Sequence, residues 1–98
     1  MKADDLKLSA AEQRAVQMLR LLANPARLRI VTLLAERKEC TAAQLAAAVG
    51  LAQSTLAEHL GGLRNAGVVQ TSGEGTHRCY CLDPEAVEFL AAYLGGVA

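Results

Sequence analysis

The stretch of sequence that decides the fold is TAAQLAAAVGLAQSTLAEHLGGLRNAG, residues 41 to 67. Thr41 and Gln44 form a capping box that predicts the start of a short helix, and Gly50 is typical of a helix end. A second helix is expected soon afterwards, because leucines recur there at helical spacing, at Leu56, Leu60 and Leu63. Two short helices joined through a glycine predict a helix-turn-helix, whose second helix can enter the DNA major groove.

Two further helices are expected before this motif. Ser9 and Glu12 form another capping box, and apolar residues then recur at helical spacing over roughly residues 10 to 23. Asn24 followed by Pro25 indicates a new helix start, because asparagine caps helices and proline is tolerated at the first helical position. The strongly apolar stretch that follows predicts a helix that ends near Glu36.

After the motif, the pattern changes from helical spacing to two strand-like runs. Residues 68–71 and 76–82 predict the strands of a hairpin with a glycine-rich tip, and Asp83 with Pro84 predicts the start of a last helix. We therefore expect one winged helix-turn-helix domain over residues 1–98, mainly α with a small β-hairpin, in the order α-α-α-α-β-β-α. The first and last helices carry apolar stripes wider than a small core can cover, which predicts a dimer joined through these terminal helices.

Composition limits the possible partners. Ten basic and ten acidic residues give a formal net charge of zero, so DNA binding must come from a local arrangement of side chains. The first residues lack a signal-peptide pattern, and no apolar run reaches the roughly 18 residues of a membrane span, which predicts a soluble, cytoplasmic chain without a membrane partner. The three cysteines form no disulfide-framework spacing, so we expect reduced thiols.

Other functional classes have little support in the sequence. Ser54 and His59 lie five residues apart on one expected helix and thus well apart around it, so they are not a credible nucleophile and base. No phosphate loop, paired catalytic carboxylates or metalloprotease motif is present, so we do not expect an enzyme. A winged helix used only for protein contact remains an alternative because the net charge is neutral.

Three stretches of the chain together resemble the ArsR/SmtB family of bacterial repressors. The resemblance covers LLANPARLRIVTLLAE at 21 to 36, QLAAAVGLAQSTLAEHLGGLRNAGVV at 44 to 69, and GEGTHRCYCLDPEAV at 73 to 87. It implies a homodimer joined through the first and last helices, a recognition helix that begins near Ala52, and a wing at Gly73 to Thr76. It also implies binding to double-stranded operator DNA and release when an effector binds, often a metal ion or metalloid.

The sequence departs from that family at both of its familiar metal sites. The arsenic-binding C-x-C pair would fall near Thr41 and Ala43, neither of which is cysteine. The zinc site of the last helix needs aspartate, histidine and glutamate, whereas this segment offers Glu85 and Glu88 without a histidine. Ala52 stands where the family often has serine, so we expect no side-chain cap on the recognition helix.

Candidate DNA-contacting residues follow from the helix-turn-helix frame. The first turn of the recognition helix can reach base edges, and glutamine can pair bidentately with adenine. Basic residues near the wing and at the helix end are candidate phosphate partners, while a histidine in mid-helix has packing as an equal alternative. The candidates are Gln53, Ser54, Thr55, His59, Arg64, His77 and Arg78.

The segment HRCYCLD, residues 77 to 83, is the candidate effector site. Because side chains alternate across a strand, Cys79 and Cys81 should share the outer face with His77, while Tyr80 and Leu82 face the core. A disulfide between residues two apart on a strand would be strained, whereas two thiols can chelate a large soft ion. No resident cofactor is required, and the family resemblance adds trivalent arsenic or antimony to the soft metal ions as possible effectors.

The third ligand of such a site is open in the sequence. Cys40 would complete the site if the segment before the third helix pairs with the last strand of the hairpin, and it is alternatively a small buried core residue. His77 or a group from a partner subunit is another candidate ligand. A repressor that responds to oxidation of the same cysteines is the rival interpretation.

Overall fold

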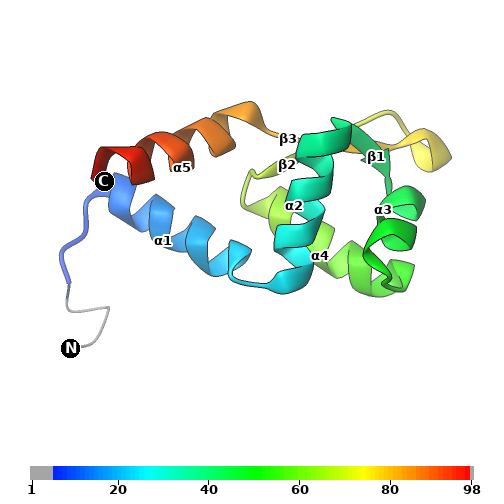
Figure 1. Cartoon of the computed structure of the whole chain (residues 1–98), viewed down its shortest axis with the longest axis horizontal. Helices are drawn as coiled ribbons and strands as arrows, with labels where there is room; N and C mark the ends of the chain where they lie inside the picture. Colours follow the sequence, from blue (N-terminus) through cyan, green and yellow to red (C-terminus); the bar gives the residue numbers. More distant parts are fainter. Residues whose placement is uncertain (1–5, 98) are drawn as a thin grey trace.

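The computed structural model describes residues 6–97 and contains five α-helices, three short strands and one 3-10 turn. In chain order the elements are α1 (Ala10–Leu22), α2 (Pro25–Arg37), β1 (Glu39–Thr41), α3 (Ala42–Val49), α4 (Gln53–Asn65), β2 (Val69–Ser72), η2 (Gly75–His77), β3 (Cys79–Leu82) and α5 (Pro84–Val97). Helices α1 and α5 extend together from one end of the molecule, and α3 lies with the turn between β2 and β3 at the other (Figure 1). The winged helix-turn-helix order predicted from the sequence is confirmed.

The helix starts are fixed by the side chains that the sequence indicated. The Ser9 hydroxyl accepts a hydrogen bond from the Glu12 amide, and the Glu12 carboxylate accepts one from the Ser9 amide. Asn24 caps α2 by accepting from the Arg27 amide, with Pro25 as the first helical residue. These caps satisfy amides that have no partner inside the helix, so the local sequence sets where each helix begins.

The small sheet has one more strand than the sequence predicted. Its order is β1-β3-β2, and both neighbours pair antiparallel with the central strand β3. The predicted element order did not include β1, because so short a segment shows no alternation of its own, although its pairing with the last strand of the hairpin was considered for Cys40. Its pairing with β3 comes from the tertiary structure.

The second strand of the hairpin is shorter than predicted. It begins at Cys79 rather than Thr76, because residues 75–77 form the turn η2. The His77 amide donates to the Glu74 carbonyl at 3.0 Å, and the Arg78 amide donates to the Gly75 carbonyl at 3.2 Å. Gly73 permits this close turn, since a Cβ at that position would lie 2.4 Å from the His77 carbonyl oxygen and its φ is +79°.

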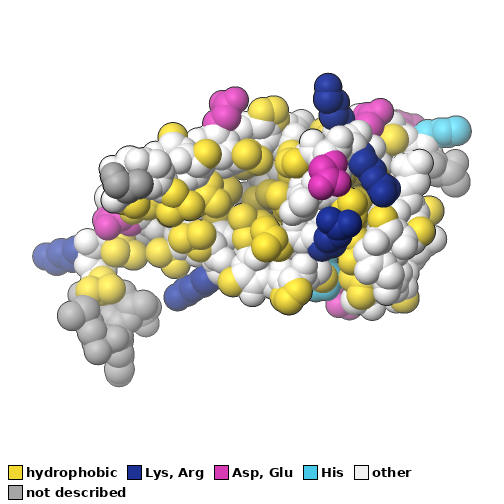
Figure 2. Space-filling model, in the orientation of Figure 1, with side chains coloured by type: hydrophobic (Ala, Val, Ile, Leu, Met, Phe, Trp, Pro, Cys, Tyr) yellow, Lys and Arg dark blue, Asp and Glu magenta, His cyan; other side chains and the backbone are white. Residues whose placement is uncertain are grey.

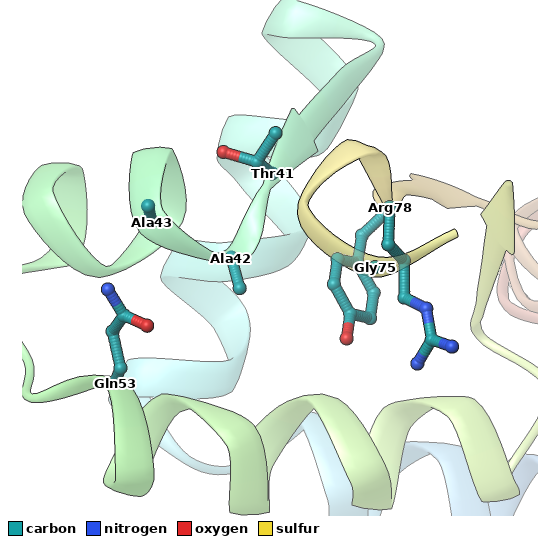
Figure 3. A pocket seen from close by; sticks show the side chains of 7 residues that line it. Thr41, Ala42, Ala43, Gln53, Gly75 and Arg78 are labelled. Carbon is teal, nitrogen blue, oxygen red and sulfur yellow. The ribbon is translucent and has the colours of Figure 1, made fainter. Parts of the chain in front are cut away.

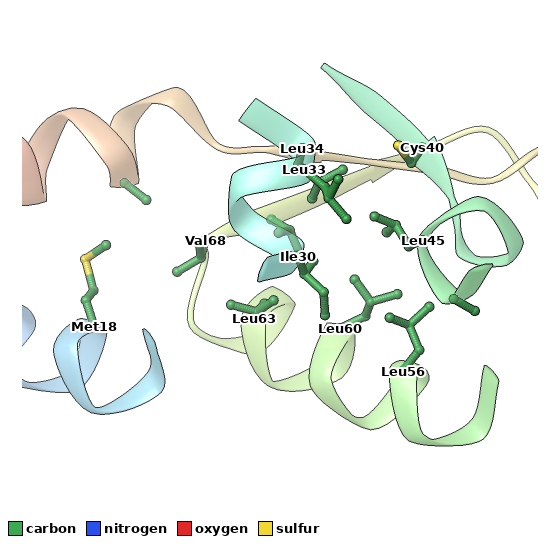
Figure 4. Packing of buried hydrophobic residues seen from close by; sticks show 13 residues of the cluster. Met18, Ile30, Leu33, Leu34, Cys40, Leu45, Leu56, Leu60, Leu63 and Val68 are labelled. Atoms are coloured by element: carbon green, nitrogen blue, oxygen red, sulfur yellow. The ribbon is translucent and has the colours of Figure 1, made fainter. Parts of the chain in front are cut away.

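The core lies where α2, α3, α4 and the sheet meet (Figure 4). Its largest fully buried side chains are all leucine, isoleucine or valine, which pack closely without aromatic residues. They are Ile30, Leu33, Leu34, Leu45, Leu56, Leu60, Leu63 and Val68. The three leucines predicted to face inward from α4 are thus confirmed, and they fix which side of this helix is left to solvent.

Helices α1 and α5 leave an apolar groove between themselves and the body of the molecule. Figure 2 shows hydrophobic side chains gathered between these two helices and α2. The groove has a volume of about 240 Å³ and is lined by Met18, Leu22, Val31, Val68, Val87, Leu90, Ala91 and Leu94. Leu94 in its lining and Leu19, which follows Met18 on α1, remain 44% and 43% exposed. Among residues 6–97, no helix has the length and apolar character needed to cross a membrane.

One ion pair joins the two terminal helices. The Arg14 guanidinium donates to both carboxylate oxygens of Glu85, at 2.9 Å from Nη1 to Oε2 and 2.5 Å from Nη2 to Oε1. The guanidinium carbon also lies 4.2 Å from the centre of the Phe89 ring. These hydrogen bonds raise the pKa of Arg14 and lower the pKa of Glu85. The contact therefore ties α1 to the first turns of α5.

Candidate nucleic-acid interface and thiol pair

The helix-turn-helix presents the first turn of α4 to solvent. Gly50 ends α3 in a left-handed conformation with φ of 80°, and α4 begins after two further residues. Its buried leucines face the core, so the residues on the other side, Gln53, Ser54 and Thr55, are all exposed. As first-turn residues, their amides have no partners inside the helix, and Ala52 offers them no side-chain cap.

An open groove separates the first turn of α4 from the wing, the β2–β3 hairpin with its turn. Its volume is about 600 Å³, and its walls are Thr41, Ala42, Ala43, Gln53, Gly75, Arg78 and Tyr80. In Figure 3, Gln53 lies on one side of this groove and Arg78 on the other. Two of the predicted DNA-contacting residues, far apart in the sequence, thus share one surface. The start of α3 and Tyr80 also belong to this surface, and sequence reasoning missed both.

The other predicted DNA-contacting residues lie outside the groove lining. Arg64 is exposed in the last turn of α4, and His77 is exposed in η2. His59 is half-buried, and its Nδ1 is buried without a hydrogen-bond partner among the described residues. The packing alternative considered for His59 therefore fits its position better than a phosphate contact.

The register of the sheet determines which cysteines lie together. Cys79 is opposite Thr41 on β1 and Ser72 on β2, whereas Tyr80 is opposite Cys40. Because directly opposed residues share a face and neighbours alternate, Cys79 and Cys81 lie on one face and Cys40 lies on the other. Cys40 is 2% exposed and packs in the core (Figure 4). The predictions that Cys40 is core-facing and that the other two thiols face outward agree with this register.

Cys79 and Cys81 form a two-thiol site on the outer face of β3. Both are half-buried and free, and the Cys79 thiol donates a weak hydrogen bond to the His77 carbonyl, with a distance of 3.7 Å. Residues 6–97 contain no cluster of three or more histidine, cysteine, aspartate or glutamate side chains placed to hold a metal ion. The structure does not bring Cys40 to this pair, because the sheet lies between them.

The expected place of His77 beside the two thiols is corrected by the same geometry. Strand alternation was extended to His77, but this residue lies in η2 rather than on β3. The alternation of side chains therefore does not reach it, and its side chain is exposed at the wing tip. The two thiols lie on the same face of one strand and can be reached from solvent, so they can bind a soft ion together.

Comparison with known proteins gives a consistent result. Residues 24–71 match the family model described as bacterial regulatory protein, arsR family. The uncharacterized HTH-type transcriptional regulator Rv0081 of Mycobacterium tuberculosis strain H37Rv is 41% identical over 76 residues, which are 76% of this chain and 67% of that protein.

Solved structures are similar in fold as well as in sequence. A possible transcriptional regulator for arsenical resistance superposes with a TM-score of 0.72 at 34% identity, covering 83% of each chain. The homodimeric winged helix-turn-helix domain of Mb0332 from Mycobacterium bovis, a possible ArsR-family regulator, gives a TM-score of 0.69 at 29% identity. That match covers 86% of this chain and 79% of the Mb0332 domain.

Proposed function

The chain belongs to the ArsR family of bacterial regulatory proteins, and from this premise we propose that it is a homodimeric transcriptional repressor. In this proposal it binds operator DNA through α4 and the wing. It leaves the operator when a thiophilic ligand, trivalent arsenic or antimony or a soft metal ion, binds Cys79 and Cys81. The two thiols that the register of β3 places on one face carry the effector half of the proposal.

The groove between α4 and the wing supports the DNA-binding half. Gln53 begins the recognition helix with an exposed amide side chain, which can read an adenine edge in the major groove. Ser54 and Thr55 follow it with exposed hydroxyls, and Arg78 reaches the same groove from the wing as a phosphate partner. Because the net charge is zero, we expect sequence-specific contacts to dominate over non-specific attraction.

The apolar groove beside α1 and α5 supports a homodimer. Its lining is entirely hydrophobic, and Leu94 in the lining and Leu19 on α1 remain partly exposed in the single chain. A patch of this kind marks an interaction surface in a soluble protein. The homodimeric state of the similar Mb0332 domain makes a second copy the simplest occupant. A two-fold dimer also presents two recognition helices to an operator with two half-sites.

The chemistry of the two thiols supports a soft, thiophilic effector. Thiolate sulfur is a soft ligand, so a pair of thiols favours a soft ion or a metalloid over a hard cation, which prefers oxygen ligands. Arsenous acid can condense with two thiols, forming two arsenic–sulfur bonds and releasing two water molecules, with arsenic remaining trivalent throughout. Such chemistry requires reduced thiols, which the cytoplasm maintains. Resemblance to a possible regulator for arsenical resistance favours a metalloid.

Release follows if the ligand prefers a conformation that binds DNA poorly. β3 is the second strand of the wing and leads directly into α5, so a ligand on this strand contacts the segment between the DNA surface and the dimer surface. A ligand shifts the equilibrium only by its difference in affinity for the two states. We expect coupling of about 1–3 kcal/mol, which corresponds to roughly 5–150-fold in operator affinity.

The proposal is tested by titrating the reduced protein on DNA from the region upstream of its own gene. Arsenite, antimonite, zinc, cadmium, copper(I) and peroxide are added separately while release is followed by gel shift. Wild-type protein should bind this DNA selectively and leave it with a thiophilic ligand. Release by peroxide without release by any metal or metalloid would favour the redox alternative. Absence of sequence preference would favour a protein-contact module.

Substitution of the two thiols locates the effector site. We expect the double variant Cys79→Ser with Cys81→Ser to bind the operator as wild type does and to lose release by arsenite. The matched control is Cys40→Ala, which removes the third thiol from the opposite face of the sheet and should keep release. Unchanged release in the double variant rules out the proposed site.

A further inference from the structure

Tyr80 connects two surfaces that the proposed function uses. In β3 it stands between Cys79 and Cys81, and its side chain projects to the opposite face of the sheet, where Cys40 is its neighbour on β1. It is half-buried against the core and forms a wall of the groove that also contains Gln53 and Arg78. One residue thus has the thiol pair on either side of its backbone and the DNA-facing groove at its side chain.

From this placement we infer that Tyr80 is a DNA-contacting and positioning residue whose ring is displaced when a ligand bridges Cys79 and Cys81. This inference rests on the proposed thiol site, because ligand binding at that site changes DNA binding through Tyr80. In the unbridged protein the ring supports the groove wall and its hydroxyl donates to the DNA backbone. In the bridged protein the ring leaves that position, and the contact is lost.

The first step is geometric. Residues two apart on an extended strand have Cα atoms about 6.5–7 Å apart. A bridging arsenic atom spans this separation with less strain than a disulfide does, but it still holds both sulfurs at one short separation and draws the two side chains together. Peptide groups are planar, and the flexible backbone dihedrals between the two cysteines include those of Tyr80. A bridge that fixes both sulfurs therefore acts on the backbone at Tyr80 as well as on the side-chain torsions of the two cysteines. Because its side chain points the opposite way, curvature at the thiols turns the ring.

The second step is set by packing. On the core side of the sheet, Tyr80 is opposite Cys40, which is 2% exposed among buried leucines. A close-packed core does not admit further ring volume without strain. The groove, by contrast, is open and has a volume of about 600 Å³. The ring therefore moves into the groove, between Gln53 and Arg78, where it obstructs DNA.

The third step concerns the hydroxyl. A tyrosine hydroxyl is an uncharged donor that can contact a phosphate without adding charge to the interface. A typical hydrogen bond of about 1 kcal/mol corresponds to roughly fivefold in affinity. Loss of this contact and obstruction by the ring add in the same direction, so bridging weakens operator binding.

The experiment uses phenylarsine oxide as the probe, because it bridges two thiols irrespective of the natural effector. The reagent forms two arsenic–sulfur bonds, its oxygen leaves with the two thiol protons as one water, and arsenic stays trivalent. Mass spectrometry confirms one adduct per chain, and the Cys79→Ser variant is the control that cannot bridge. Operator affinity is then measured with and without the adduct in wild type, Tyr80→Phe and Tyr80→Leu.

Wild type should lose about tenfold or more in operator affinity on bridging, within the usual range of allosteric coupling. Before bridging, Tyr80→Phe should bind the operator about fivefold more weakly than wild type does. After bridging, the two proteins should bind equally, so the loss of affinity on bridging is about fivefold smaller in Tyr80→Phe. Tyr80→Leu should respond less than about threefold, because it has neither ring nor hydroxyl. If Tyr80→Leu fails to fold, Tyr80→Phe retains the packing and decides the question.

Movement of the ring is measured directly by fluorine NMR. The chain has two tyrosines, so 3-fluorotyrosine in a Tyr93→Phe background reports on Tyr80 alone. Bridging should shift this signal, and serine at residue 79 should abolish the shift. An unshifted signal, or Tyr80→Phe with wild-type affinity and response, overturns the inference but leaves the proposed function intact. A full adduct that leaves wild-type operator binding unchanged overturns both.

Discussion

Lys38 adopts a backbone conformation that is costly for a lysine. Its φ is 68° and its ψ is −47°, and it is the sole non-glycine residue with positive φ that the structure describes. The side chain is exposed, while the amide donates to the Leu34 carbonyl to close α2. The strain arises from the Cβ atom, so glycine would adopt the same turn without it.

We therefore expect Lys38→Gly to stabilise the protein by about 1 kcal/mol, the lower end of the cost of such a conformation. Urea unfolding at one fixed protein concentration measures the difference, since the stability of a dimer depends on concentration. Arg37→Gly is the control, because this neighbour is the last residue of α2 and has ordinary helical backbone. It should destabilise the protein by up to about 1 kcal/mol. Equal effects of the two substitutions would contradict the assigned strain.

At the scale of single residues, the sequence predicted which face of a strand a side chain occupies better than it predicted which residues lie beside that side chain. Alternation along one strand is a local property, and it correctly assigned Cys79 and Cys81 to one face and Tyr80 to the other. It failed at His77, because the turn η2 depends on hydrogen bonds across a glycine-containing loop that period-two spacing does not show. The participation of Tyr80 in the groove was also hidden, since it requires α4 and the wing to be placed together.

At the scale of elements, α4 lacks the side-chain cap that α1, α2 and α3 possess. Ala52 has φ of −63° and ψ of 148°, the extended conformation of an N-cap residue, but its methyl group accepts no hydrogen bond. A serine here can accept from the amide of Ser54 or Thr55 without a change in the backbone. We expect Ala52→Ser to stabilise the protein by about 1 kcal/mol.

Thermal or urea unfolding compares this variant with Ala57→Ser, which puts the same residue at an exposed position inside the same helix. The control should lose about 0.5 kcal/mol, because serine forms helix less readily than alanine. A stabilising effect at both positions, or at neither, would mean that the first turn of α4 gains nothing from a cap.

The ion pair between α1 and α5 makes stability depend on pH. Hydrogen bonds from Arg14 lower the pKa of Glu85 below its ordinary value of 4.5. A carboxylate with a depressed pKa stabilises the folded state above its unfolded pKa, and this contribution is lost as the pH falls through the folded value. We expect Glu85→Gln to lower the melting temperature at neutral pH, with the difference from wild type shrinking below about pH 4.5.

Melting curves from pH 7 to pH 3 test this expectation, and added salt should also reduce the difference because both partners are exposed. Glu88→Gln is the matched control on α5, since the described side chains include no ion pair at that residue. If Glu85→Gln lowers the melting temperature equally at every pH, the carboxylate acts by packing rather than by charge.

Element starts were predictable where a side chain caps a backbone amide. The starts of α1, α2 and α3 follow from Ser9, Asn24 and Thr41, each of which makes the expected hydrogen bond. Strand β1 was not predictable in the same way, because three residues carry no periodic signal and pair only through contacts distant in the sequence. Local chemistry determined the helices, and tertiary contacts determined the sheet.

At the scale of the whole molecule, the apolar surface of α1 and α5 should control assembly. The sequence predicted apolar stripes too wide for the core, and the structure adds the groove with Val87 and Leu94 in its lining. The depth of the groove could not be predicted, because it depends on the angle at which α1 and α5 extend from the rest of the molecule (Figure 1). We expect Leu94→Glu to place a charge in the proposed dimer interface and to dissociate the dimer.

Analytical ultracentrifugation compares wild type, Leu94→Glu and Leu28→Glu at the same concentration. Leu28 is the control, because it is 52% exposed on α2 and is not part of the groove. Wild type and the control should sediment as dimers and Leu94→Glu as a monomer with weaker operator binding. Dissociation by both glutamates, or by Leu28→Glu alone, would place the interface elsewhere.

The position of both thiols outside the core has a consequence for how such a regulator can evolve. The side chains at residues 79 and 81 do not belong to the buried cluster, whereas Tyr80 between them packs against it. Two neighbouring positions can therefore exchange their chemistry while the strand, the wing and the recognition helix keep theirs. With the effector bound at these thiols as proposed, the signal that is sensed and the DNA that is read can change independently, through separate and few substitutions.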